Sequence, residues 1–214
     1  MICVAISDKH TQKCLDILDN VEMAEIRLDL TETALSDFQK IFSHSTKKIA
    51  TCRFDTTGLQ VQREKLKKAV DCGAEYIDIE IETPEVQRTE LVNYARERNC
   101  RVIISYHNFK ETPGLRELYA LVDKCFEFGA DVAKLATMVK SKEDNARLMA
   151  LYSTGKAVVS LGMGEIGKVT RLTSLMLGAE FSFAAQDDGR ITAPGQITYS
   201  AMKKLIEQIK QTLS

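Results

Sequence analysis

The sequence predicts an α/β protein, a parallel eight-stranded (β/α)8 TIM barrel, and three observations support this prediction. Short runs rich in β-branched residues alternate with longer segments of helical period along the whole chain. Eight such units in unbroken order give a parallel sheet, and eight strands favour closure into a barrel. The length of 214 residues fits one compact barrel without linkers, so residues 1–214 are expected to form a single domain.

The predicted strands are short, and helical segments fill the intervals between them. The strands are expected at residues 2–6, 23–28, 48–53, 76–81, 101–106, 132–135, 157–161 and 181–184. Residues 83–98 are expected to form a helix, in which Pro84 suits the first turn. Residues 114–128 keep one apolar face of helical spacing, and the last helix runs from about residue 197 to residue 211.

Composition excludes several classes of protein. With 29 Lys and Arg against 30 Asp and Glu, the chain has no basic excess that would attract nucleic acid or an anionic membrane. The amino-terminal residues lack the basic region and cleavage site of a signal peptide, and no apolar run is long enough to cross a bilayer. The six cysteines form no C-x-x-C pair and lie mostly in apolar segments. They are expected to be buried free thiols of a cytoplasmic protein.

Two of the predicted strands carry charged residues at alternate positions. These residues are Glu25, Arg27 and Asp29 on the second strand and Asp78, Glu80 and Glu82 on the fourth. Because side chains alternate between faces, each strand has one charged face and one apolar face. In an antiparallel sheet the charged face would meet water. Here the helices must cover the apolar faces, so the charged faces are expected to line the barrel interior.

Further polar residues lie near the carboxyl ends of neighbouring strands. They are Thr51 and Arg53 on the third strand, Ser105 and His107 on the fifth, and Lys134 on the sixth. A barrel interior normally holds aliphatic side chains, and barrel active sites lie at the carboxyl ends of the strands. The set therefore predicts a catalytic site.

Lys134 lies among small apolar residues on a short strand. Desolvation and nearby cations such as Arg27 and Arg53 would lower the pKa of its amine, whereas neighbouring carboxylates would raise it. A neutral amine can form an imine with a ketone and turn the carbonyl into an electron sink. The alternative is an ordinary lysine that extends from a strand end into water.

His107 is the one histidine of three that the predicted strands place at the barrel mouth. An imidazole can take and return a proton near neutral pH, and Lys134 one β/α unit later favours that role over a structural one. No second histidine or cysteine has ligand spacing around His107, so no metal site is expected.

Two loops near the end of the barrel indicate an acidic substrate. Residues 162–167 match the dinucleotide pattern G-x-G-x-x-G, but they lie in the seventh unit and Glu165 would meet the pyrophosphate, so no dinucleotide is expected. Arg171 offers a planar fork for a carboxylate. Thr192 and Gln196 precede the last helix, whose amino terminus favours an anion.

Seven short motifs occur in order along essentially the whole chain. They are Glu25-Ile26-Arg27-Leu28-Asp29, Thr51-Cys52-Arg53, Asp78-Ile79-Glu80, Ser105-Tyr106-His107-Asn108-Phe109, Ala133-Lys134-Leu135-Ala136, Met163 with Gly167 and Arg171, and Ala193-Pro194-Gly195-Gln196. Together they resemble type I 3-dehydroquinate dehydratase of the shikimate pathway. That family is a (β/α)8 barrel, often a homodimer, and it needs no metal or cofactor.

The resemblance implies a substrate, a reaction and a role for each matched residue. Lys134 would form a Schiff base at the C3 ketone of 3-dehydroquinate. His107 would remove a C2 proton and help expel the C1 hydroxyl as water, giving 3-dehydroshikimate, with Asp78 as the acidic residue near the pair. The implied substrate-binding residues are Arg171, Gln196 and Thr192 for the carboxylate, Glu25, Arg27 and Arg53 for the ring hydroxyls, and Met163 and Phe183 for the ring.

The chain departs from the family at two positions. The family usually shows Arg-x-x-x-Glu-Gly-Gly after its third strand, with the Glu close to the histidine. An ungapped comparison from Arg53 places Thr57 at the Glu position, so His107 is expected to lack that carboxylate unless Asp55 or Asp78 compensates. Thr192 replaces a Ser and keeps the hydroxyl.

Two other functions remain open at this point. Another Schiff-base barrel enzyme, such as an aldolase, would keep Lys134 but would not need Arg171 together with Gln196. A catalytically silent barrel that binds a metabolite or a protein would have no reason to keep both Lys134 and His107.

Overall fold

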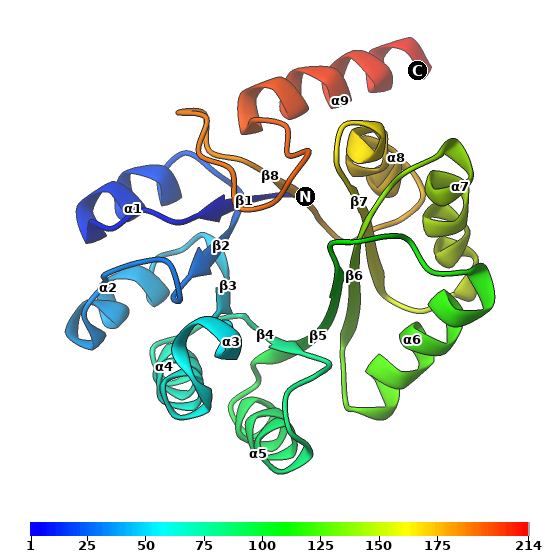
Figure 1. Ribbon diagram of the computed structural model, residues 1–214. Helices are drawn as coiled ribbons and strands as arrows, with labels where there is room; N and C mark the ends of the chain where they lie inside the picture. Colours follow the sequence, from blue (N-terminus) through cyan, green and yellow to red (C-terminus); the bar gives the residue numbers. More distant parts are fainter. Residues whose placement is uncertain (214) are drawn as a thin grey trace.

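The computed structural model describes residues 1–213, in which eight parallel strands form a ring surrounded by helices (Figure 1). The strands are β1 (Ile2–Ile6), β2 (Met23–Arg27), β3 (Lys47–Thr51), β4 (Tyr76–Glu80), β5 (Arg101–Asn108), β6 (Val132–Met138), β7 (Val158–Met163) and β8 (Ser182–Ala184). The α-helices are α1 (Thr11–Leu18), α2 (Phe38–Phe42), α3 (Phe54–Thr57), α4 (Leu59–Asp71), α5 (Glu85–Arg96), α6 (Leu115–Glu127), α7 (Lys142–Ala150), α8 (Val169–Met176) and α9 (Tyr199–Leu213). The predicted barrel is confirmed.

The strands follow the order β7-β6-β5-β4-β3-β2-β1-β8, and every neighbouring pair is parallel. Within the described residues, β7 and β8 are therefore the two edges of the sheet, and the ring is nearly closed. We call the junction between these edges the β7–β8 seam. Helix α8 contacts both edge strands and covers the seam from outside.

Two hydrophobic clusters adjoin the polar interior, one between the strands and the helices and one inside the ring. The apolar faces of the strands pack against the helices, for example Ile26, Ile77 and Ile104. Inside the ring, a second cluster that includes Met23 and Tyr76 fills the amino-terminal end. Two residues further along β2 to β6, polar side chains replace this floor, because alternate residues share one face, whereas β1, β7 and β8 remain apolar. The prediction that charged faces line the barrel is thus confirmed for the carboxyl-terminal half of its interior.

Several element ends differ from the prediction. Strand β4 ends at Glu80, where the chain turns through a hydrogen bond from the Thr83 amide to the Glu80 carbonyl, so Glu82 lies exposed outside the barrel. Strand β5 continues to Asn108 and therefore holds His107 within the ladder. Helix α9 begins at Tyr199, two residues later than expected.

Three further findings concern features expected from composition. All six cysteines are free and buried, which confirms the expected state of the thiols. No helix among residues 1–213 has both the length and the apolar character needed to cross a membrane. The same residues contain no group of three His, Cys, Asp or Glu side chains that could hold a metal ion.

Candidate active site

A cavity opens at the carboxyl ends of the strands, inside the mouth of the ring. Ten of the predicted site residues line it: Glu25, Arg27, Arg53, His107, Lys134, Met163, Arg171, Phe183, Thr192 and Gln196. Asp78 is fully buried and contacts Lys134. The structure therefore brings all eleven predicted residues together, although they come from seven β/α units.

Lys134 projects from the middle of β6 and is 5% exposed. Its Nζ lies 2.8 Å from Oδ2 of Asp78 and 3.3 Å from Oε1 of Glu25. The same Nζ lies 4.1 Å from the centre of the Phe183 ring. The contacts hold the amine at the base of the cavity, where a ketone entering from the mouth would meet it.

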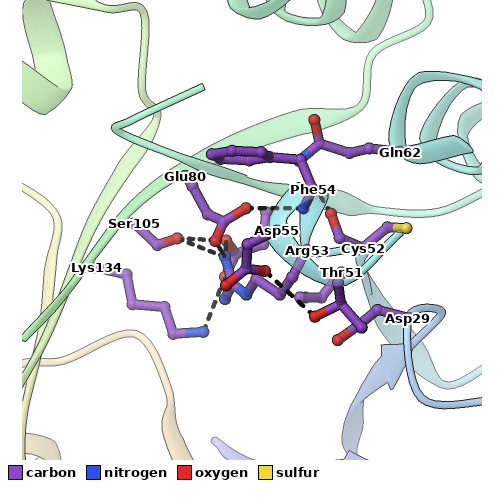
Figure 2. A network of polar contacts seen from close by, with 12 residues as sticks. Asp29, Thr51, Cys52, Arg53, Phe54, Asp55, Gln62, Glu80, Ser105 and Lys134 are labelled. Carbon is purple, nitrogen blue, oxygen red and sulfur yellow. Dashed lines mark hydrogen bonds and ion pairs between the residues drawn. The ribbon is translucent and has the colours of Figure 1, made fainter. Parts of the chain in front are cut away.

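Asp78 is the centre of a network of polar and charged groups, of which Arg53, Ser105 and Lys134 are labelled in Figure 2. Arg53 donates to both of its oxygens, at 2.9 and 3.3 Å, and Ser105 donates to Oδ1 at 2.6 Å. Burial acts to raise the pKa of Asp78, but Arg53 and Lys134 outweigh it and hold that pKa well below the usual range. Asp78 is therefore a permanent anion that fixes Lys134 and Arg53.

The two charged residues of β2 have fixed partners. Thr51 donates to Oε1 of Glu25 at 2.9 Å. Arg27 donates to both oxygens of Asp29, at 3.0 and 2.6 Å, which turns its guanidinium along the rim of the cavity. These contacts fix the positions of Glu25 and Arg27.

His107 lies near the carboxyl end of β5, partly exposed to the cavity. Its ring stacks on Phe109 with centroids 6.3 Å apart, and it has no hydrogen-bond partner among residues 1–213. Burial, together with the cations Arg53 and Lys134, lowers the pKa of His107 well below its ordinary value of 6.5, although Asp78 opposes the shift. The ring is thus neutral at physiological pH and can accept a proton.

Arg171 is a buried cation in the cavity wall, 2% exposed. It donates to the backbone carbonyls of Gly195 at 3.0 Å, Phe183 at 3.1 Å and Pro194 at 3.5 Å. Burial lowers its pKa to about 10, so it remains charged at neutral pH. Among residues 1–213 it has no acidic partner within ion-pair distance, and an unpaired buried charge favours binding of an anion.

Gln196 organises the loop between β8 and α9. Its Oε1 accepts hydrogen bonds from the amides of Thr192 at 2.7 Å and Ala193 at 3.3 Å, and its Nε2 donates to the Thr192 hydroxyl at 3.1 Å. These contacts fold the loop and place the hydroxyl and the amide side by side at the cavity.

The glycines of the G-x-G-x-x-G pattern allow two loops to approach each other. A Cβ on Gly167 would lie 2.5 Å from the carbonyl carbon of Gly162, and a Cβ on Gly195 would lie 2.4 Å from the carbonyl oxygen of Gly164. Only glycine fits such backbone contacts. The first contact lies within the loop between β7 and α8, and the second crosses the β7–β8 seam, so close backbone packing accounts for Gly162, Gly167 and Gly195.

A family model for type I 3-dehydroquinase matches residues 2–213. The chain belongs to the type I 3-dehydroquinase family. As a type I 3-dehydroquinase it is an enzyme, a hydro-lyase. This finding favours the dehydratase over the aldolase and over the catalytically silent barrel.

Curated relatives and solved structures resemble this 3-dehydroquinase over nearly its whole length. A 3-dehydroquinate dehydratase from Methanococcus maripaludis is 33% identical, over 98% of this chain and 100% of its own. One from Coxiella burnetii is 32% identical, over 97% and 92%. Solved type I 3-dehydroquinate dehydratase from Clostridium difficile superposes with a TM-score of 0.85 at 22% identity, covering 99% of this chain and 92% of that one. At that identity the structural likeness shows the fold.

Thr57 does not line the cavity of this 3-dehydroquinase, contrary to the ungapped comparison. It ends the short helix α3, and its hydroxyl donates back to the Arg53 carbonyl one turn earlier, at 2.9 Å. This backbone contact is common for threonine in a helical turn. Asp55 and Thr56 face the cavity in its place.

Thr57→Glu is consequently expected to leave the acidic limb of the kcat/KM pH profile where it is. A carboxylate raises the pKa of an imidazole only from nearby, and residue 57 points away from the cavity. Two pH–rate profiles at equal salt, wild type and variant, test this. An upward shift of the limb in the variant would show that residue 57 does couple to His107.

Seven further residues line the cavity without having been assigned a role from the sequence. They are Asp55, Thr56, Glu80, Phe109, Ala136, Leu161 and Ala193. The period-2 pattern placed Glu80 in the interior without giving it a role, and it could have found Ala136 too, because each lies two residues beyond an inward-facing residue of its own strand. Asp55 and Thr56 lie in a turn whose shape no periodic signal predicts.

Proposed function

We propose that this enzyme removes water from 3-dehydroquinate to give 3-dehydroshikimate, through a Schiff base at Lys134. The observation that best supports this is the position of a buried amine at the base of a cavity whose wall holds an unpaired arginine. The amine would react with a ketone, and the arginine would bind a carboxylate on the same small molecule.

Lys134 would supply the electron sink. Counted from the ammonium form, its nitrogen bonds to C3 in place of the carbonyl oxygen, two of its three protons leave with that oxygen as water, and the third remains on the protonated imine. Asp78, fixed as an anion by Arg53, stabilises the positive charge of that imine as it does the charge of the free ammonium.

His107 would move the protons. The neutral ring takes a proton from C2, and the electron pair of the broken C–H bond moves toward the imine nitrogen to give an enamine. The imidazolium then gives its proton to the C1 hydroxyl, which leaves as water as the double bond forms. Hydrolysis of the imine restores Lys134 and the ketone of the product.

The cavity walls would orient the substrate. Arg171, Gln196 and Thr192 surround the proposed carboxylate position, and Met163 and Phe183, both almost fully buried, provide apolar contact for the ring. Glu25, Arg27 and Arg53 provide charged partners for the ring hydroxyls on the opposite wall.

Borohydride trapping tests the proposed function. Borohydride added together with 3-dehydroquinate is expected to reduce the imine to a stable amine and to inactivate the enzyme. Peptide mass mapping should place the adduct on Lys134. In a parallel reaction without borohydride, the product should appear with the ultraviolet absorbance of a conjugated enone. An adduct on another lysine, or turnover without any adduct, would contradict the mechanism.

Arg171→Lys is expected to raise KM about tenfold although it keeps the charge, because an ammonium cannot match a carboxylate with two parallel hydrogen bonds. The comparison requires KM and kcat/KM of the wild type and the variant. If both values stay within a factor of about two, Arg171 does not bind the carboxylate.

We also infer a homodimer in the cytoplasm, as the resemblance implies. Exposed apolar side chains on and beside α8, among them Val169, Met176 and Leu177, support contact with a second subunit. Buried free thiols fit a reducing compartment. Light scattering on the eluted protein measures the mass, and a value for one chain would contradict the dimer.

A further inference from the structure

Glu80 is a cavity carboxylate to which the proposed reaction gives no role. It is the last residue of β4 and is 9% exposed. On its strand it follows Asp78 by two positions, so both side chains point into the barrel, with Glu80 nearer the mouth. Burying a carboxylate at this depth costs free energy unless hydrogen bonds and a paired charge compensate for the loss of water.

The contacts of Glu80 lead to the turn that follows β3. Its Oε2 accepts a hydrogen bond from the Phe54 amide at 3.2 Å, and its Oε1 lies 4.0 Å from Nη1 of Arg53 (Figure 2). Phe54 is the first residue of α3, and Arg53 at its N-cap position makes no side-chain capping hydrogen bond. Glu80 thus supplies, from a neighbouring strand, an acceptor that the turn itself lacks.

The position of α3 matters for the cavity on both of its sides. Toward the mouth, α3 presents Asp55 and Thr56 to the cavity. Toward the base, Arg53 makes the fork on Asp78 that in turn holds Lys134. A shift at the start of α3 would therefore move groups at the rim directly, whereas Lys134 would keep its own contacts with Asp78 and Glu25.

We propose that Glu80 is a positioning residue, whose carboxylate fixes the start of α3 so that Arg53 and Asp55 meet the ring hydroxyls of the substrate. The inference deepens the proposed function, on which it rests for the identity of those hydroxyls. Because the reacting amine and imidazole stand on β6 and β5, loss of Glu80 should affect substrate binding more than the chemical steps.

The charge of Glu80 should change near neutral pH. The charged and titratable groups that face it are Arg53 and Asp55 from the turn, Asp78 from its own strand and His107 across the cavity. Burial raises the pKa of Glu80 to about 7, with Arg53 and the Phe54 amide opposing the shift and Asp78 adding to it. Above that pH the carboxylate accepts a charge-assisted hydrogen bond, and below it a weaker neutral one. KM should therefore rise as pH falls through 7.

The raised pKa of Glu80 also distinguishes a role in positioning α3 from a role in stabilising the fold. A folded-state pKa above the ordinary value of 4.5 means that the ionised form is the less favourable one in the folded protein. Glu80→Gln should then fold at least as stably as the wild type at pH 8, and its melting temperature should not fall. A residue kept for stability alone would show the opposite.

The test compares the wild type, Glu80→Gln and Glu82→Gln between pH 6 and 8.5. Glu82 is the matched control, because the same change is made two residues away on an exposed side chain outside the cavity. We expect the KM of the wild type and of Glu82→Gln to rise roughly fivefold between pH 8 and pH 6, and that of Glu80→Gln to be high and nearly constant. The kcat of Glu80→Gln should change by less than its KM.

A KM of Glu80→Gln that follows the wild type at every pH would overturn the proposal. So would a fall in kcat with KM unchanged, because that pattern assigns Glu80 to the chemical step. Borohydride labelling of the wild type distinguishes failure of the role of Glu80 from failure of the Schiff-base function. If Lys134 is labelled and Glu80→Gln behaves as wild type, only the role of Glu80 fails; if no lysine is labelled, the Schiff-base function fails.

Discussion

Lys134→Arg is expected to abolish turnover while the protein keeps its fold. A guanidinium keeps a positive charge beside Asp78 and Glu25 but does not condense with a ketone. Loss of the covalent step should lower kcat by roughly 10⁴-fold or more, the scale found when a nucleophile is removed from an enzyme. The assay is the enone absorbance of the product, together with borohydride labelling, which should vanish.

Lys134→Met provides the complementary variant. It removes both the amine and the charge, and leaves two buried carboxylates with one fewer cation. Breaking a buried ion pair in this way costs about 3–5 kcal/mol, so the melting temperature of this variant should fall below that of Lys134→Arg. Product formation by either variant at more than about a hundredth of the wild-type rate would be incompatible with an obligatory imine.

His107→Ala is expected to form the imine and then stall. The amine and the proton-transfer group are separate side chains, so trapping should still label Lys134 while kcat falls by about 10²–10⁴-fold. In the wild type, burial and the neighbouring cations lower the pKa of His107, so the base remains unprotonated well below pH 6.5. The acidic limb of kcat/KM that reports this group should accordingly lie below pH 6.5.

His10→Ala is the matched control for that variant. His10 is exposed, precedes α1 and is not part of the cavity lining, so its loss should leave kcat unchanged. Turnover of His107→Ala close to that of His10→Ala would remove the imidazole from the mechanism.

The barrel and most of the site could be predicted because a strand has a strict period of 2. Once Ile77 and Ile79 face the helices, Asp78 and Glu80 must face the barrel interior, and parallel order brings such faces together at one end. Lys134 and His107 were found in the same way, since both stand within strands.

The remaining features depend on where strands end and on contacts between distant residues. Glu82 was misplaced because it lies just beyond β4, where the chain turns and the alternation no longer applies. Thr57 was misplaced because the ungapped comparison from Arg53 does not account for the short helix α3. The acceptor for the Phe54 amide comes from Glu80, 26 residues away along the chain. No local pattern contains such a contact, although it determines where α3 lies.

The β7–β8 seam lies beside the residues proposed to bind the carboxylate and away from those proposed to react. Asp78, His107 and Lys134 stand on β4, β5 and β6, inside the continuous hydrogen-bonded run of the sheet, whereas Arg171 and Gln196 follow its two edge strands. Because β7 and β8 are not hydrogen-bonded to each other, they can shift relative to each other without breaking hydrogen bonds between strands. Strands in the middle of the sheet can separate only if several such hydrogen bonds break together. Substitutions beyond the edge strands are therefore expected to alter the proposed carboxylate site without changing the spacing of Asp78, His107 and Lys134.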